Sequence, residues 1–581
     1  MPILLETATQ CMTCTWRIDD LDRDQVALEL GVSRLAASVY LQRGIHNKAD
    51  LDRVKDYRVS RLFPFALMPD AEVALKRLCR AIKRREKIYV WGDYDADGIT
   101  AAAVMSIGLT AVGADFVCGL PDRFRDGYDL SANVIDYAKS QNAKLIVTVD
   151  CGIRAIEAAE VAKQASIDLI ITDHHQPDPT GRLPQCVAVV NPNRLDSDYP
   201  FGGLAGVGIA QKLVVALAER LGKDSRQVFR DTIGLVAIGT VADVAEMRSE
   251  NRILVYHGCR SLSRTLKPGL RSLLTSAGVT DVDETAIGWK IGPRLNAVGR
   301  LGDPMDALRL LLAQDELTAS QLGTAIDKAN RLRKEIQVQA MTGAQAMIDA
   351  AGDGPSANVL WSASWHPGVI GLVAGDLARA TGKPTFIISI GEDGIARGSC
   401  RSVGDLNIMA VLESPACRPL FSRLGGHHQA AGFSMLEENL PELHRRICAE
   451  VSLCCFDSKP MQEVADVEAQ LGDFTVQAYE EICQLAPFGS GFEPPKFLIT
   501  DAAFVRSWSL AGKGKAYRLK GSGTGSSSIK MKDWRSLAET VGWRAGRKAQ
   551  AICEFGLNVY RGVVSPELNL VAISEPRERN D

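Results

Sequence analysis

The stretch KIYVWGDYDADGITAAAV, residues 87–104, places three carboxylates at alternate positions between an apolar run and an alanine-rich run. The apolar run KIYVW is β-branched and aromatic and predicts a buried strand, whereas the residues after Gly98 predict a helix. An EF-hand loop also begins D-x-D-x-D-G, but it needs a glutamate at its twelfth position, where this chain has Val104. We therefore expect a strand-to-helix turn that carries Asp93, Asp95 and Asp97.

Apolar runs recur along the chain up to about residue 245 and alternate with amphipathic patterns. They read DFVCGL, KLIVTV, DLIIT, VAVVN and finally DTIGLVAIGTVADVAEM. Apolar strands separated by helices predict a parallel sheet covered on both faces, so the expected fold class is α/β with a doubly wound sheet. In such a sheet, ligands bind in the crevice beyond the carboxyl ends of the strands.

The rest of the chain predicts further domains. A helical pattern over residues 315–351 carries one apolar stripe and ends at AGDGP, which favours a connector between two domains over a coiled-coil arm. A second α/β unit with a helix over 369–380 follows, and the short strands and Gly/Ser turns after it predict a small β-barrel. The expected segments are 1–60, 61–314, 315–351, 352–455 and 456–581.

Composition excludes some classes of protein. The 581 residues include 67 Lys and Arg against 70 Asp and Glu, so local patches must hold any polyanion. The 14 cysteines show no disulfide spacing, which favours a reducing, cytoplasmic compartment. Cys11 and Cys14 are spaced like half of a zinc site, but no second pair follows. Neither a signal peptide nor a membrane span is expected.

Further acids follow the other expected apolar runs. Asp150 follows KLIVTV, Asp173-His174-His175 follows DLIIT, and Asp243 ends the run TVAD. Each acid alone could be a helix cap or a turn residue. Together, the carboxylates and two histidines would repel strongly unless cations lay between them. Oxygen and nitrogen ligands suit Mn²⁺ or Mg²⁺, and two such ions would form a clamp for phosphodiester hydrolysis.

The motifs GDYDADG, VTVDCG, TDHH and TVADVAEM, in this order, resemble the four motifs of the DHH phosphoesterase superfamily. PDRFRDGY, GPRLNAVGRLGD, WHPGVIGLVAGDLA, GGHHQAAGF and PFGSGFEPP more narrowly resemble the RecJ-type single-strand-specific exonucleases, from about residue 60 to the end. The resemblance implies a DHH catalytic domain over 61–314, a DHH-associated substrate-binding domain over 352–455 and an OB-fold over 456–581.

The resemblance also implies a role for each candidate metal ligand. Asp95 and Asp97 would each bind one of two divalent cations, and Asp150 would bridge both. His174 and Asp243 would complete the second site. Water activated by the cations would attack phosphorus in line, so that no protein nucleophile is needed.

Three neighbouring residues would support this centre. By the same resemblance, Asp93 would support the first metal, His175 would face the scissile phosphate and Asp173 would orient the loop. Trp91 stands where pyrophosphatases of the superfamily carry a metal-binding histidine, which argues against pyrophosphate hydrolysis.

Candidates for substrate contact lie in both expected α/β domains. The glycines of RLGGHHQAAGF allow close approach to a phosphate, although a plain Gly-Gly turn is the alternative. The arginine and serines of GSCRS suit a terminal phosphate. In the second domain the candidates are Ser399, Arg401, Ser402, Gly425, Gly426 and His427. In the first domain they are Arg123, Arg125, Arg294 and Asn296.

The expected barrel is locally basic. Residues 501–561 contain twelve Lys or Arg against four Asp or Glu. Interleaved with them are Trp508, Tyr517, Trp534, Trp543 and Tyr560. Basic side chains can follow the phosphate backbone of a nucleic acid, and aromatic side chains can stack on its bases. The pattern therefore predicts a surface that binds single strands, and a basic face that is merely solvated is the alternative.

We therefore expect a cytoplasmic, two-metal exonuclease on single-stranded DNA. The resemblance alone implies 5′ to 3′ polarity, release of mononucleotides and a role in DNA repair and recombination. One alternative is a DHH phosphodiesterase of oligoribonucleotides or cyclic dinucleotides, which usually lacks a barrel. Another is a non-catalytic scaffold, although all ligands are present. The expected partners are single-stranded DNA, a single-strand-binding protein and a helicase, and the expected state is a monomer without membrane contact.

Overall fold

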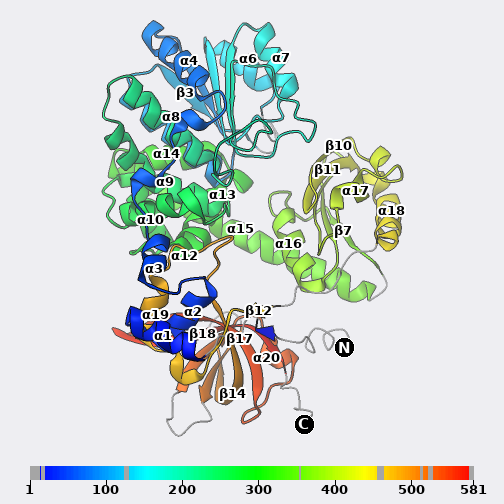
Figure 1. Cartoon of the computed structure of the whole chain (residues 1–581). Helices are drawn as coiled ribbons and strands as arrows, with labels where there is room; N and C mark the ends of the chain where they lie inside the picture. Colours follow the sequence, from blue (N-terminus) through cyan, green and yellow to red (C-terminus); the bar gives the residue numbers. More distant parts are fainter. Residues whose placement is uncertain are drawn as a thin grey trace. The chain divides into compact units, whose positions relative to one another are not determined.

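The computed structural model describes residues 20–122, 130–352, 355–454, 463–510, 514–520 and 528–574, together with the backbone of strand β1 (Thr13–Cys14). The chain divides into two compact units, whose elements are labelled in Figure 1. The parallel-sheet unit comprises Asp56–Lys334 and Pro487–Glu493. The barrel unit comprises Met1–Lys55, Glu335–Ala486 and Pro494–Asp581.

Five parallel strands form the centre of the parallel-sheet unit, in the order β3-β2-β4-β5-β6. The strands are β2 (Ile88–Trp91), β3 (Phe116–Gly119), β4 (Leu145–Val149), β5 (Asp168–Thr172) and β6 (Ala188–Val190). They are the five short apolar runs predicted from the sequence. Because β3 and β4 lie on opposite sides of β2, the strand order switches direction at β2 and β4, where doubly wound sheets bind ligands.

Helices cover both faces of this sheet (Figure 1). Val90 and Val147 face a core shared with α4, α5, α8 and α9, whereas Tyr89 and Ile146 face a core shared with α6 and α7. This alternation is the period of two that a strand imposes. The helices are α4 (Ala71–Arg84), α5 (Ala96–Ala111), α6 (Ala132–Ser140), α7 (Ile156–Gln164), α8 (Gly206–Arg220) and α9 (Ser225–Ala242).

The last predicted strand was wrong, because most of DTIGLVAIGTVADVAEM lies in helix α9. Leu235, Val236, Ala237 and Ile238 are consecutive and all buried, since α5, α8 and α10 pack around the helix. Burial on every side removes the apolar period that distinguishes a helix from a strand. The unit continues with α10 (Ser249–Ser263), α11 (Pro268–Ala277), α12 (Glu284–Ala286), α13 (Gly292–Leu301) and α14 (Pro304–Leu312).

The predicted connector is the long helix α15 (Glu316–Ala351), and the division between the units falls within it. The sheet that follows has the order β10-β11-β9-β8-β7. Its helix α16 (Ile370–Thr381) was predicted over 369–380 and ends at Gly382 with φ +63°. The other elements are β7 (Asn358–Ser362), β8 (Thr385–Ile390), β9 (Ile395–Arg401), α17 (Ile408–Leu412), β10 (Arg423–His427), β11 (Ala430–Leu436) and α18 (Leu440–Leu453).

The C-terminal strands form the predicted barrel. Their order is β13-β14-β15-β16-β18-β17, and β14 also pairs with β17, which closes the sheet. The strands are β12 (Val464–Ala465), β13 (Val467–Glu468), β14 (Lys496–Ser509), β15 (Lys515–Lys520), β16 (Ser528–Asp533), β17 (Ala549–Tyr560) and β18 (Val563–Ser574), with α19 (Val476–Cys483) and α20 (Leu537–Thr540). Helices α1 (Asp20–Leu30), α2 (Arg34–Gln42) and α3 (Lys48–Val54) belong to the same unit.

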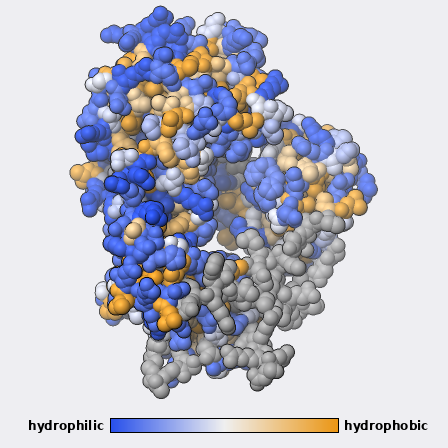
Figure 2. Space-filling view, viewed as in Figure 1, coloured by the Kyte–Doolittle hydropathy of each residue, from blue (hydrophilic) through white to orange (hydrophobic). Residues whose placement is uncertain are grey.

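The surface is mixed in character. On the face drawn in Figure 2, hydrophilic side chains predominate and hydrophobic ones form scattered patches. Among the described residues, no helix has the length and apolar character that crossing a membrane would require. The predictions for Arg123, Arg125 and Cys11 and for the side chain of Cys14 lie outside the described residues.

Candidate metal centre

Acidic side chains gather beyond the carboxyl ends of three neighbouring strands. Asp93 and Asp95 follow β2, Asp150 follows β4 and Asp173 follows β5, as predicted. Asp243 joins them from a different kind of element, because it caps the C-terminal end of helix α9.

Three groups of side chains bring their ligand atoms within 4.8 Å of one another. The groups are Asp93-Asp95-Asp150, Asp97-His174-Asp243 and Asp150-His174-His175. Asp150 and His174 each belong to two groups, so the clusters are contiguous. The arrangement has the form of two adjacent cation sites that meet at Asp150.

Two buried atoms at the middle of this cluster have no hydrogen-bond partner, namely His174 Nε2 and Asp150 Oδ1. His174 Nε2 lies 3.1 Å from Asp150 Oδ1 and 3.9 Å from Asp243 Oδ2. Burial lowers the pKa of His174 to about 4, so the ring is neutral at pH 7 and offers a lone pair. Unpaired buried polar atoms are costly, and carboxylates with a neutral imidazole are a suitable donor set for Mn²⁺ or Mg²⁺.

Burial and mutual repulsion raise the pKa values of the central carboxyls. Burial first, and then the charge of Asp95, raises the pKa of Asp97 to about 7. Burial and the charge of Asp97 raise the pKa of Asp243 to about 8, and the pKa of Asp150 is raised well above its usual range. Cations between these groups would relieve the repulsion and restore the ionised forms.

Backbone donors fix the direction of the acidic loop. Asp95 is the N-cap of α5 and accepts hydrogen bonds from the N–H groups of Asp97 (2.9 Å) and Gly98 (3.1 Å). Asp97 accepts from Gly206 N–H (2.7 Å) and Val207 N–H (2.9 Å) at the start of α8. Each carboxylate oxygen keeps a second lone pair, so these hydrogen bonds orient the oxygens toward the centre and still permit a cation.

Asp173 organises the loop that carries the two histidines, as the resemblance implied. It accepts from Ile153 N–H (2.9 Å), His174 N–H (2.7 Å) and the Nδ1 of His175 (2.7 Å). Burial opposes charge on His175, but the hydrogen bond to Asp173 outweighs burial and raises the pKa of His175 to about 9. His175 is therefore an imidazolium at neutral pH, with Nε2–H as its second donor.

Two asparagines that the sequence reasoning missed hold the same loop. Asn191 Nδ2 donates to His175 O (2.9 Å), and Asn193 Nδ2 donates to His174 O (2.5 Å). Both follow β6, the strand next to β5. Asn191 ends the apolar run VAVVN and Asn193 lies two residues later, so their position at the same sheet edge was the available signal.

Asn296 and Arg294, two predicted substrate contacts of this unit, make internal contacts. Asn296 Oδ1 accepts from Ala96 N–H at 2.7 Å, so it steadies the acidic loop. The Arg294 guanidinium lies 2.9 Å from Asp327 Oδ1 and donates to the carbonyls of Lys290 and Ser276. A contact of either residue with substrate stays a prediction.

The remaining predicted contacts lie in the barrel unit. Ser399 and Arg401 are on β9, Ser402 follows it, and Gly425, Gly426 and His427 are on the edge strand β10. Arg401 donates to Cys400 O (2.8 Å) and to Ser399 Oγ (3.3 Å). A side chain at Gly371, in the first turn of α16, would lie 3.0 Å from Ser399 Oγ and 3.4 Å from the Arg401 guanidinium. The predicted phosphate ligands thus meet a helix N-terminus, which favours anions.

The aromatic surface predicted on the barrel is smaller than expected. Tyr517 and Trp543 are buried and pack around Phe504, with ring centroids 5.0 and 4.8 Å from it. The prediction that they belong to a stacking surface was wrong. Tyr517 is on β15, where alternate residues face the barrel interior, and Trp543, in the connection between α20 and β17, packs against both Phe504 and Tyr517. Trp534 and Tyr560 remain exposed, with a cation over each ring. Trp508 is half-buried.

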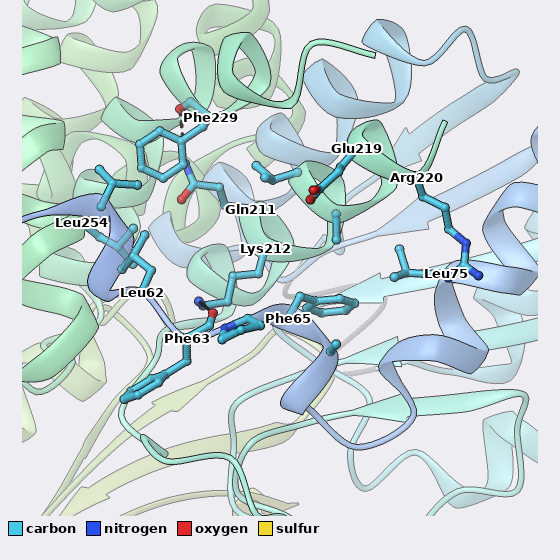
Figure 3. Close-up of a pocket in the computed structure, with 15 residues that line it drawn as sticks. Leu62, Phe63, Phe65, Leu75, Gln211, Lys212, Glu219, Arg220, Phe229 and Leu254 are labelled. Atoms are coloured by element: carbon cyan, nitrogen blue, oxygen red, sulfur yellow. Dashed lines mark hydrogen bonds between the residues drawn. The ribbon is translucent and has the colours of Figure 1, made fainter. Parts of the chain in front are cut away.

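A pocket of about 450 Å³ in the parallel-sheet unit lies elsewhere (Figure 3). Its wall is mainly apolar, with Phe63 and Phe65 contributed by one segment and Phe229 by helix α9. Lys212 Nζ at this pocket donates to Phe63 O (2.7 Å) and to Glu250 (2.6 Å). No member of the metal centre lines it, so we place the candidate functional site at the carboxylate cluster.

Comparisons with known proteins bear on this cluster. Family models for the DHH family N-terminal domain, the DHHA1 domain and the RecJ OB domain match residues 87–240, 354–453 and 465–572. The single-stranded-DNA-specific exonuclease RecJ of Bacillus subtilis is 32% identical over 96% of this chain and 71% of its own length. This chain belongs to the RecJ family.

Other RecJ proteins extend the comparison. RecJ of Escherichia coli is 33% identical over 80% of this chain and 82% of its own length. The crystal structure of RecJ from Thermus thermophilus in complex with Mn²⁺ matches with a TM-score of 0.80 at 28% identity, over 98% of this chain and 80% of that one. A second structure of that RecJ is a complex with Mg²⁺. These are the two ions that the donor set here favours.

Proposed function

We propose that this chain is a metal-dependent exonuclease that hydrolyses single-stranded DNA. The observation that carries the proposal is the contiguous cluster of carboxylates and a neutral histidine at the switch point of a RecJ-family sheet. Its relatives are named single-stranded-DNA-specific exonucleases, and the OB-fold of the family is present as a closed barrel with exposed Trp534 and Tyr560.

In this proposal, Asp93, Asp95 and Asp150 hold one Mn²⁺ or Mg²⁺, and Asp97, His174 and Asp243 hold the second with Asp150 between them. The ions, when bound, supply positive charge that activates water and stabilises the charge developing on the phosphoryl oxygens. Asp173 keeps a proton of His175 on Nδ1, so that the cationic ring has Nε2–H as a second donor, which we assign to the scissile phosphate.

The barrel unit supplies the contacts that select the end of the strand. Arg401 and Ser399, beside the start of α16, suit a 5′-terminal phosphate, which carries more charge than an internal phosphodiester. Gly425, Gly426 and His427 on the exposed strand β10 offer close backbone approach nearby in the same sheet. This end selection would give 5′ to 3′ digestion with release of mononucleotides.

The proposed setting is DNA repair and recombination in the cytoplasm. The barrel and the end-selecting sheet favour long single strands as substrate, so we propose a single-strand-binding protein and a helicase as partners that deliver them to the monomer. Hydrolysis of oligoribonucleotides or cyclic dinucleotides is the alternative activity, and it uses the same metal centre.

The test is digestion of single-stranded DNA labelled at its 5′ or 3′ end, in Mn²⁺, beside matched RNA and duplex DNA. We expect mononucleotides from the 5′ end of single-stranded DNA. Asp150→Ala should abolish hydrolysis and keep most strand affinity, because the barrel is unchanged. Equal cleavage of RNA, preference for cyclic dinucleotides, or near-normal turnover by the Asp150→Ala variant would contradict the proposal.

A further inference from the structure

Trp289 is the most exposed tryptophan in the part of the chain that the structure describes, with 80% of its surface accessible. An indole ring has a large apolar face, and burying it is strongly favoured. It lies in the parallel-sheet unit, on a turn of π-helix formed by Ile287–Ile291 between α12 and α13. π-Helical turns are rare and occur often at functional sites.

The local sequence explains the π-turn. An α-helix through this segment would need an N–H from Pro293 for the carbonyl of Trp289, and the proline ring would clash with that carbonyl. The chain widens instead, and Gly292 N–H bonds to Ile287 O, five residues back. The Arg294 guanidinium takes up Lys290 O at 2.7 Å, which satisfies another carbonyl of the widened turn. The backbone geometry that presents Trp289 is therefore built in.

The π-turn and helix α13, which continues it, contact two elements that carry ligands of the metal centre. A side chain at Gly288 would lie 3.7 Å from Val241, and one at Gly292 would lie 3.0 Å from Ala242, so the turn rests on the end of α9 just before Asp243. In α13, Asn296 accepts a hydrogen bond from Ala96 N–H and so holds the acidic loop. Trp289 precedes Asn296 by seven residues, which corresponds to about 10 Å along a helix.

We propose that Trp289 is a stacking platform for a nucleobase of the single strand, one or two nucleotides from the bond that is cut. This inference rests on the proposed function and adds a base contact on the parallel-sheet unit, separate from the barrel. A nucleobase is the occupant that position and charge favour. The π-turn that carries Trp289 packs on the end of α9 just before Asp243, and the exposed Lys290 next to Trp289 supplies a cation for the strand backbone. Stacking tolerates every base, as an exonuclease that degrades any sequence requires.

The test compares wild type, Trp289→Ala and Trp289→Phe on oligonucleotides that carry one abasic site at each of the first six positions. Wild type should cleave more slowly when the abasic site reaches one particular position. Trp289→Ala should be about tenfold to a hundredfold slower on intact strands, the range of one stacked base. It should show no further loss at that position, and Trp289→Phe should retain most of the rate.

A second readout avoids hydrolysis. In chelator, Trp289→Ala should weaken binding of a short intact oligonucleotide but not of the matching abasic one, while Leu266→Ala, equally exposed in the α10–α11 connection, should change neither. Independent losses from the abasic site and the substitution, or no loss at all, would overturn the platform. Failure of wild type to cleave any strand would instead remove the proposed function, so the two failures are distinct.

Discussion

Replacing Asp150 by asparagine should stabilise the metal-free protein while it abolishes the response to metal. Asp150 is 1% exposed, and its Oδ1 has no hydrogen-bond partner. Burial and the charges of four other aspartates raise its pKa well above the usual range. In the metal-free protein at pH 8, folding must therefore either bury a repelled charge or bind a proton from a dilute solution, and both cost free energy. Asparagine has the same shape and removes that cost.

The neighbouring Asp97 indicates how large the gain in stability should be. Raising its pKa from 3.8 to about 7 corresponds to about 4 kcal/mol between charged and neutral forms. Asparagine at position 150 leaves other acids in place, so we expect a gain of about 2 to 4 kcal/mol in chelator. For a unit of this size that is a rise of about 4 to 8 °C in the melting midpoint.

The matched control is Asp173→Asn. Asp173 is also 1% exposed, but its carboxylate accepts hydrogen bonds from three backbone N–H groups and from the ring of His175. Losing the charge there should lower stability by at least about 2 kcal/mol. The assay is calorimetric melting at pH 8 in chelator and then in excess Mn²⁺. A lower midpoint for Asp150→Asn in chelator, or a full Mn²⁺-induced rise in that variant, would refute the reasoning.

Further outcomes follow from single features. A side chain at Gly206 would lie 2.6 Å from Asp150 Cβ and Oδ1, so Gly206→Ala should displace that carboxylate and weaken Mn²⁺ binding at least about tenfold by calorimetric titration. Val244 has φ +57° at the end of α9, so Val244→Gly should raise stability by about 1 kcal/mol, measured by melting. In chelator, stability should fall as pH rises from about 6.5 to 9. Asp97, Asp243 and His175 have pKa values raised to about 7, 8 and 9 in the folded state, so folding holds protons there that the unfolded chain releases at lower pH. Melting at constant ionic strength across this pH range measures the fall. Arg401→Ala should lower kcat/KM about tenfold to a hundredfold on 5′-phosphorylated strands and much less on 5′-hydroxyl strands.

The parallel sheet could be predicted because its strands are short, β-branched and buried on both faces. The position of Asp93, Asp95 and Asp150 follows from the strands alone, since parallel strands place their carboxyl ends at one edge. Asp243 was predicted as a ligand, although its segment was predicted as a strand and is the end of helix α9. The acidic motif identified the residue, whereas the helical backbone depends on the packing of the surrounding helices.

Contacts between distant segments could not be read from the sequence. Arg294 looks like a free phosphate ligand until α15 brings Asp327 to it, 33 residues later. Tyr517 and Trp543 look like surface aromatics, but β15 directs Tyr517 into the barrel and the connection between α20 and β17 packs Trp543 against it. Asn191 and Asn193 support the histidine loop only because β6 pairs with β5.

The segment from Ile287 to Asn296 joins these levels of structure. Pro293 prevents a regular helix, the resulting π-turn rests on the end of α9, and Asn296 bonds the loop that carries Asp95. The segment that carries Trp289 therefore contacts the helix that ends at Asp243 and the loop that carries Asp95. If Trp289 stacks on a base, one continuous segment would both position the strand and support ligands of the two proposed cation sites, so that binding and catalysis would depend on the same backbone.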